Sequence, residues 1–245
     1  SDGNINNPIG YQGKMLEVDM HVVYGPKSTI SNFRDCFEMA GLSVERFFFS
    51  PIASALAVLA PETRKTGFCV LDIGGGTTDI AVYFDGKVHF SCVIPIGGMH
   101  ITADICHKFG TTESFADELK NEHGTATPAL VPETERIEFE IAATNKLAME
   151  SKRVLAWVIA ARLKQIFHEA NKVVNSAGLS NVLYGGLVLT GGTASIEGIA
   201  HLAAEAFGVK YVSIGYPNGV LGFPGEKPSP ILSTAIGLIH SAIRY

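Results

Sequence analysis

The sequence predicts an α/β protein in which a mixed sheet is flanked by helices and carries a helical insertion. Three apolar runs follow one another between residues 68 and 96, which is the pattern of an antiparallel meander. Residues 151–176 carry one long helical stripe, and the last third of the chain alternates between strand and helix patterns. A meander followed by crossover units gives a mixed sheet covered by helices. The helical middle of the chain is then an insertion.

Composition limits the classes of function. The chain has 245 residues, of which 47% are hydrophobic, enough for a sizeable core. The net charge is -5 and there is no block of lysine and arginine, which argues against nucleic acid as a partner. No apolar run approaches the roughly 20 residues that span a bilayer. The four cysteines lack the paired spacing of a metal site, so we expect reduced thiols and a cytoplasmic location.

The first part of the chain predicts alternating strands and helices. Residues 15–24 alternate in the manner of a strand, and 28–40 carry apolar residues at helical spacing until Gly41 ends the helix. A second strand at 44–49 and a short helix at 52–59 follow. The predicted order is therefore β, α, β, α.

The meander comes next. Its strands are "FCVLDI", "TDIAVYF" and "KVHFSCVIPI", and Asp85-Gly86 between the last two is a strong signal for a two-residue hairpin. Two helices are expected at 101–109 and 114–122, and one strand at 136–141 in a stretch punctuated by proline.

The rest of the chain predicts a long helix and a βαβα run. The helix covers about 151–176. The strand "GLVLTGG", a helix at 195–207, the strand "VKYVSI", a loop at 215–229 and a helix at 231–243 complete the chain.

The turn "DIGGGTTD" at residues 72–79 is the clearest signal of ligand binding. Three glycines remove every side chain that would keep a ligand from the backbone, and they let successive amide N–H groups point into one concavity that suits phosphate. Thr77 and Thr78 add hydroxyl donors, and Asp72 is placed to hold Mg²⁺ through water. A solvent-facing hairpin is the alternative for three glycines alone, but the flanking carboxylates and threonines favour the phosphate cradle.

A second glycine turn lies in "LVLTGGTASI". Gly191, Gly192 and Thr193 stand between a strand and a helix, where free N–H groups of a helix N-terminus can meet a ligand. An ordinary strand-to-helix turn is the alternative. The motif GxxxxGK[ST] is absent, and the first glycines precede a strand, which argues against a Rossmann fingerprint.

The two glycine turns, the meander and "PSPILSTAIGLIHSA" together resemble the actin-like ATPase superfamily, which has a ribonuclease H-like fold. Longer stretches, including "NNPIGYQGKMLEVDMHVVYG" and "VIPIGGMHITADICHKFGT", are similar to the bacterial cell-division family FtsA over nearly the whole chain. The resemblance implies four parts: the end of an FtsA-specific subdomain (1–24), the second part of the first nucleotide-binding subdomain (25–66), the second nucleotide-binding subdomain (67–98 and 180–245) and a helical insertion subdomain (99–179).

The resemblance implies an ATP site with Mg²⁺. The residues that it assigns to the phosphates, and then to adenine and ribose, are Gly74, Gly75, Gly76, Thr77, Thr78, Gly191, Gly192 and Thr193. It places Asp72 at the magnesium ion through water. Asp117 and Lys120 take the places of a carboxylate and a lysine at the ribose, and one helical turn puts them on the same face. A solvated surface pair is the alternative for these two residues.

The resemblance also implies limits on activity. The first phosphate loop of the superfamily is expected before residue 1, so we expect this chain alone to bind ATP weakly. Hydrolytic relatives place Glu or Gln near the start of "SPIASALAVL", where this chain has Ser50 and Ser54. Because a hydroxyl is a poor general base, we expect at most a weak ATPase.

The implied function is that of an ATP-binding, actin-like protein that polymerises and links FtsZ filaments to the cytoplasmic membrane at the septum. Expected partners are the FtsZ C-terminal tail, further copies of the chain and other division proteins. Arg162 and Lys164 of the insertion are the expected contacts for the acidic tail. The protein is expected to be peripheral on the inner membrane, held through a segment outside these residues. An actin-like scaffold for pilus assembly and an active ATPase or sugar kinase of the same fold are the alternatives.

Overall fold

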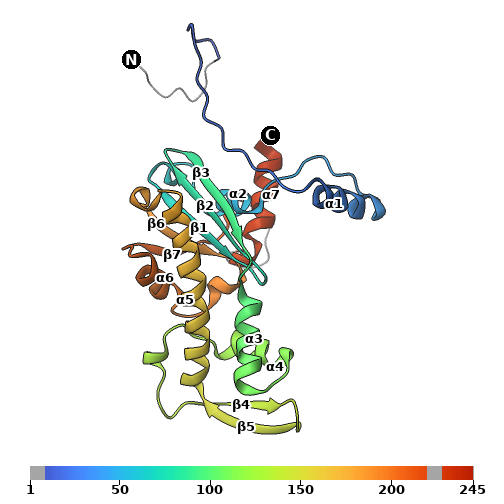
Figure 1. Ribbon diagram of the computed structural model, residues 1–245, viewed down its shortest axis with the longest axis vertical. Helices are drawn as coiled ribbons and strands as arrows, with labels where there is room; N and C mark the ends of the chain where they lie inside the picture. The colour runs from blue at the N-terminus through green and yellow to red at the C-terminus, as the bar shows by residue number, and fades with distance from the viewer. Residues whose placement is uncertain (1–8, 220–227, 245) are drawn as a thin grey trace.

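The computed structural model describes residues 9–219 and 228–244. Its centre is a five-stranded mixed sheet in the order β3-β2-β1-β6-β7 (Figure 1). The antiparallel meander consists of β1 (Phe68–Ile73), β2 (Thr78–Phe84) and β3 (Lys87–Ile94), while β6 (Gly186–Thr190) and β7 (Val212–Ile214) run parallel to β1. The predicted mixed sheet is therefore confirmed.

The turn between β2 and β3 follows from its two residues. Asp85 and Gly86 both have positive φ, 51° and 75°, as a type I′ hairpin turn requires. The strands on either side pair from Phe84 with Lys87 onwards, with one irregularity between Val82 and Tyr83.

Helices cover both faces of the sheet because side chains alternate along each strand. Leu71 and Ile73 of β1 point into the main core, against α5 (Lys152–Ser176) and α6 (Ile199–Phe207). Val70 points to the opposite face, which α2 covers. The main core continues without a break from the sheet into the helical insertion.

Two helices cross closely on that second face. They are α2 (Ser50–Val58) and α7 (Ser233–Arg244), and they lie side by side in Figure 1. A Cβ atom added at Gly237 of α7 would lie 1.8 Å from the carbonyl oxygen of Ala53 in α2. Glycine therefore sets the distance between these two helices.

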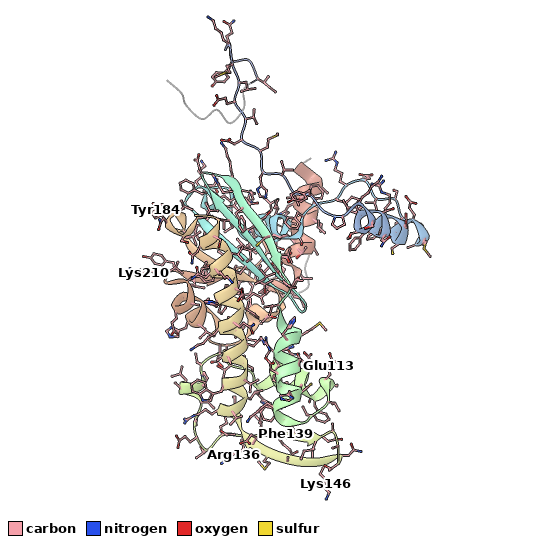
Figure 2. The ribbon with its side chains drawn as sticks, in the orientation of Figure 1. Glu113, Arg136, Phe139, Lys146, Tyr184 and Lys210 are labelled. Atoms are coloured by element: carbon pink, nitrogen blue, oxygen red, sulfur yellow. The ribbon has the colours of Figure 1, made fainter. Side chains whose placement is uncertain are left out.

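The helical insertion extends away from the sheet (Figure 1). It contains α3 (Gly98–Phe109), α4 (Glu113–His123), a hairpin of β4 (Arg136–Ile141) and β5 (Lys146–Ser151), and most of α5. Phe139 packs edge to face on Phe109 with 5.0 Å between ring centroids, and Figure 2 shows Phe139 at the hairpin end of the insertion. The predicted helices and β4 are confirmed. The strand β5 was not predicted, because "KLAMES" has no β-branched residue.

Two predictions for the first part of the chain are wrong. Residues 15–24 and 44–49 are not strands, and in the described chain no strand pairs with either segment. An alternating pattern forms a strand only where a neighbouring strand supplies hydrogen bonds. The helix between them, α1 (Lys27–Met39), is present as predicted, and none of its residues is buried.

Several boundaries also differ from the predictions. The helix α2 begins two residues earlier than expected, with Pro51 in its first turn, where proline is favourable. Of the predicted helix at 195–207, only Ile199–Phe207 is α-helical, because Ser195 ends a 3₁₀ turn and residues 196–198 are not helical. Part of the predicted loop at 215–229 lies outside the described residues. The 3₁₀ turns are η1 (Thr63–Lys65), η2 (Pro128–Leu130), η3 (Ser180–Val182), η4 (Gly192–Ser195) and η5 (Pro230–Leu232).

The longest helix is α5, with 25 residues. In the part of the chain that the structure describes, no helix combines the length and the apolar character needed to cross a membrane.

Candidate functional site

The glycine hairpin has an open outer surface. The N–H of Gly74 donates to the carbonyl of Thr77 at 2.9 Å and closes the turn between β1 and β2. A Cβ added at Gly76 would meet nothing within 4 Å, and one at Gly75 would meet only the side chain of Met99, at 3.5 Å. The backbone of this turn is therefore accessible, as an anion-binding concavity requires.

The N-terminus of α3 packs directly against this turn. The N–H groups of Gly98 and Met99 donate to the carbonyls of Gly74 and Gly75, both at 2.8 Å. A Cβ added at Gly97 would lie 2.6 Å from each of those two carbonyl oxygens, so only glycine allows the approach. Gly97 and Gly98 were not predicted as part of the site. The pair of glycines at the start of α3 is the sequence feature that could have indicated this close approach.

The second glycine turn meets the first. Because β1 and β6 are neighbouring parallel strands, their carboxyl ends lie at the same edge of the sheet. The Thr193 hydroxyl donates to the carbonyl of Gly74 at 3.2 Å. Gly191 has φ of 85°, and a Cβ added there would lie 2.3 Å from Oδ1 of Asp72. The residues predicted at 72–78 and at 191–193 are thus brought together in one site.

Asp72 is bound at one of its two carboxylate oxygens. Its Oδ2 accepts hydrogen bonds from Ser54 Oγ at 2.5 Å and from Thr234 Oγ1 at 3.0 Å. Its Oδ1 lies beside Gly191 and accepts no hydrogen bond from any residue that the structure describes. A carboxylate oxygen that is free next to an open backbone concavity fits a magnesium ion held through water.

A second carboxylate stands opposite Asp72. Asp79 faces Asp72 across the β1–β2 register and accepts hydrogen bonds from the hydroxyls of Ser50 and Thr77. Burial raises the pKa of Asp79, and the charge of Asp72 raises it further. Asp79 therefore binds a proton more readily than an aspartate that is fully exposed to water. No separate role was predicted for Asp79 from the sequence.

The two threonines of the hairpin have different surroundings. The Thr78 hydroxyl is buried and donates to the carbonyl of Ile96 at 2.7 Å, which ties the hairpin to the start of the insertion. The Thr77 hydroxyl lies 3.4 Å from Asp79. In this structure the side chain of Thr78 already has a partner within the protein.

Asp117 and Lys120 form an ion pair on α4, as their spacing predicts. Lys120 Nζ also donates to Thr102 Oγ1 at 2.8 Å. The hydrogen bond from Lys120 lowers the pKa of Asp117. Thr102 lies one turn along α3 from Gly98. The Asp117–Lys120 ion pair is therefore hydrogen-bonded to the helix whose N-terminus contacts the glycine hairpin.

Arg162 and Lys164, which were predicted to contact a partner protein, differ in their contacts within this chain. Arg162 donates two hydrogen bonds to Asp104 of α3, at 2.6 and 2.7 Å, and one to Gln165. The hydrogen bonds to Asp104 raise the pKa of Arg162. Lys164 is exposed on the outer side of α5. Trp157, which is 60% exposed, lies seven residues before Lys164 and so on the same side of the helix.

Comparison with known proteins identifies a family that matches this chain. Residues 69–237 match the family model described as cell division protein FtsA. The cell division protein FtsA of Neisseria meningitidis serogroup B is 35% identical over 241 residues, covering 98% of this chain and 58% of the relative. That of Escherichia coli K12 is 35% identical over 243 residues, covering 96% and 58%. The chain thus spans less than two thirds of the length of these relatives.

Solved structures give the fold. MreB5 of Spiroplasma citri bound to ADP superposes with a TM-score of 0.70 at 17% identity, covering 90% of this chain and 67% of that one. The PilM-PilN type IV pilus biogenesis complex matches with a TM-score of 0.62 at 17% identity, covering 87% and 57%. These likenesses confirm the predicted actin-like fold.

Proposed function

This chain belongs to the FtsA family of cell-division proteins, and we propose that it is an ATP-binding, actin-like protein that links FtsZ filaments to the cytoplasmic membrane at the septum. The observation that carries the proposal is the convergence of two glycine turns around the free oxygen of Asp72. Polymerisation, contacts with other division proteins and a peripheral location on the inner membrane belong to the same proposal.

Each part of the site has a proposed task. The backbone N–H groups of Gly75 and Gly76 and the hydroxyl of Thr77 bind the phosphates. Gly74 and Thr78 shape the turn around them, because the N–H of Gly74 and the hydroxyl of Thr78 already donate within the protein. The turn from Gly191 to Thr193 and the Asp117–Lys120 pair bind adenine and ribose. Asp72 holds Mg²⁺ through water, and the ion, when bound, neutralises phosphate charge. Solved structures of MreB5 of Spiroplasma citri bound to ADP and to AMPPNP support a nucleotide in this fold.

We propose that the nucleotide acts mainly as a conformational ligand. The hydroxyls of Ser50 and Ser54, which occupy the segment expected to position an attacking water, donate to Asp79 and Asp72. A serine hydroxyl is a poor general base at neutral pH. We therefore do not expect fast hydrolysis, and we propose that bound ATP favours closure of the nucleotide-binding subdomains around it.

Replacing Gly76 by valine should block ATP binding without disturbing the fold. Nothing lies within 4 Å of the position of the added Cβ, and φ at Gly76 is not positive, so the side chain can enter the concavity without strain. We expect at least about a tenfold loss of affinity, ~1.4 kcal/mol, in equilibrium dialysis with Mg-ATP. Gly25→Val is the matched control, because Gly25 has the same open surroundings far from the site. Equal affinity of both variants and the unsubstituted chain would exclude this turn as the phosphate site.

We propose that the exposed side of α5 binds the acidic C-terminal tail of FtsZ. Lys164 supplies a positive charge and Trp157 an exposed aromatic surface on the same side of the helix. Arg162 contributes less directly, because its guanidinium is bound to Asp104. Aromatic residues next to a cation form a suitable surface for an acidic, partly apolar peptide.

Lys164→Glu should weaken binding of an FtsZ C-terminal peptide by roughly three- to tenfold, since an exposed ion pair contributes about 0.2–1 kcal/mol and the reversed charge adds repulsion of similar size. Trp157 is the only tryptophan of the chain, so its fluorescence reports binding directly. The control is Lys172→Glu on the same helix, where the lysine side chain is 67% exposed. If both variants bind the peptide equally well, the tail binds elsewhere.

A further inference from the structure

Two hydroxyls from different helices hold the magnesium-binding carboxylate. Ser54 belongs to α2 and Thr234 to α7, 180 residues apart in sequence, yet their oxygens are 2.9 Å from each other. Both hydroxyls lie within hydrogen-bonding distance of Asp72 Oδ2. Each hydroxyl has one proton to donate, and a carboxylate is the stronger acceptor, so both protons go to Asp72.

The two hydroxyls leave the second oxygen of Asp72 available. Oδ2 receives both donors, which fixes the rotation of the carboxyl group about its last bond. Oδ1 then points to the backbone of Gly191, at the junction of the two glycine turns. A carboxylate held in this way is oriented before a metal ion arrives, and such outer partners typically change metal affinity 10- to 100-fold.

The contact depends on how α2 and α7 cross. Ser54 follows Ala53, whose carbonyl touches Gly237, and Thr234 lies one turn before Gly237 on α7. A shift of one helix relative to the other would therefore move one donor away from Asp72. Ser54 is fully buried, so its hydroxyl requires a partner inside the protein.

We propose that Ser54 and Thr234 are positioning residues for Mg²⁺, through which the crossing of α2 and α7 sets the affinity of the site for Mg-ATP. This inference rests on the proposed nucleotide site and adds residues to it. Because coupling between two equilibria is reciprocal, Mg-ATP binding should in turn favour one arrangement of the two helices. The crossing of α2 and α7 and the metal site would then each respond to a change in the other.

The test compares ATP binding with and without magnesium in the 245-residue chain. Equilibrium dialysis gives the dissociation constant for ATP in excess Mg²⁺ and in EDTA. The constant in EDTA divided by the constant in Mg²⁺ is the factor by which the metal ion strengthens ATP binding. Thr234→Val removes the hydroxyl and keeps the shape, whereas Thr234→Ser keeps the hydroxyl. We expect Thr234→Val and Ser54→Ala to reduce the ratio by about tenfold, with affinity in EDTA changed by less than about twofold. Thr234→Ser should retain the ratio of the unsubstituted chain.

Three results would overturn the inference. The first is an unchanged ratio in Thr234→Val. The second is an equal loss in Thr234→Ser and Thr234→Val, because a variant that keeps the hydroxyl should keep the ratio. In both cases the unsubstituted chain still binds Mg-ATP, and the proposed function stands. The third is an unsubstituted chain that binds ATP in neither condition, which overturns the proposed function as well. Thermal unfolding shows whether each variant folds. If Ser54→Ala does not fold, the comparison of Thr234→Val with Thr234→Ser alone decides the inference.

Discussion

Replacing Gly237 by alanine should destabilise the protein by about 1–3 kcal/mol, the usual cost of overpacking a close contact. The added Cβ would lie 1.8 Å from the Ala53 carbonyl oxygen and 3.0 Å from its Cα, so the two helices must separate. In a domain of this size the midpoint of thermal unfolding should fall by roughly 2–4 °C for each kcal/mol. The measurement is thermal or urea unfolding followed by circular dichroism.

The sign of this effect is informative. Alanine is a better helix former than glycine by about 1 kcal/mol, so an open site on α7 would be stabilised by the same substitution. Gly25→Ala provides the control for the loss of a glycine, since its surroundings are open. A Gly237→Ala variant that unfolds at or above the temperature of the unsubstituted chain would mean that α2 and α7 do not cross at this distance.

Replacing Asp72 by alanine should remove the dependence of ATP binding on magnesium. Asp72 is the carboxylate whose free oxygen lies at the junction of the two glycine turns. We expect the affinity for Mg-ATP to fall by at least about tenfold in titration calorimetry, while binding in EDTA changes little. Asp72→Asn should show the same loss, because it keeps an oxygen that Ser54 and Thr234 can bond but removes the charge.

The control for charge is Asp35→Ala, which removes an exposed carboxylate from α1. Its affinity for Mg-ATP should equal that of the unsubstituted chain. If Asp72→Ala and Asp72→Asn also bind Mg-ATP normally, the magnesium ion is held by other groups and the assignment of Asp72 is wrong.

Local features of the fold could be predicted from the sequence. Apolar runs with Asp85-Gly86 between two of them predict the meander, because strand pairing there depends on residues close in sequence. The helices of the insertion follow from their apolar stripes. Residues 15–24 have the same kind of pattern as a strand and are not one, since a strand also needs a neighbour that the pattern does not specify.

The glycines of the site could be predicted from the sequence, but the residues that hold Asp72 and the helices around it could not. Residue spacing does not predict the contact between Gly74 and Thr193, which are 119 residues apart in sequence. The family resemblance alone predicted that the two glycine turns form one site. Ser54, Thr234 and Gly237 were missed because their roles depend on how two distant helices cross. The signal available for Ser54 was a hydroxyl in the apolar helix "SPIASALAV", where it requires a buried partner.

The most direct test of the nucleotide site is a titration of the ¹⁵N-labelled chain with Mg-ATP, observed through the backbone amides of its glycines. The amide resonances of Gly74, Gly75 and Gly76, and those of Gly191 and Gly192, should shift together with one dissociation constant. The amides of Gly110, Gly178 and Gly208, at helix ends outside the two glycine turns, should not move. Saturable shifts confined to other residues, or none at all, would contradict the account.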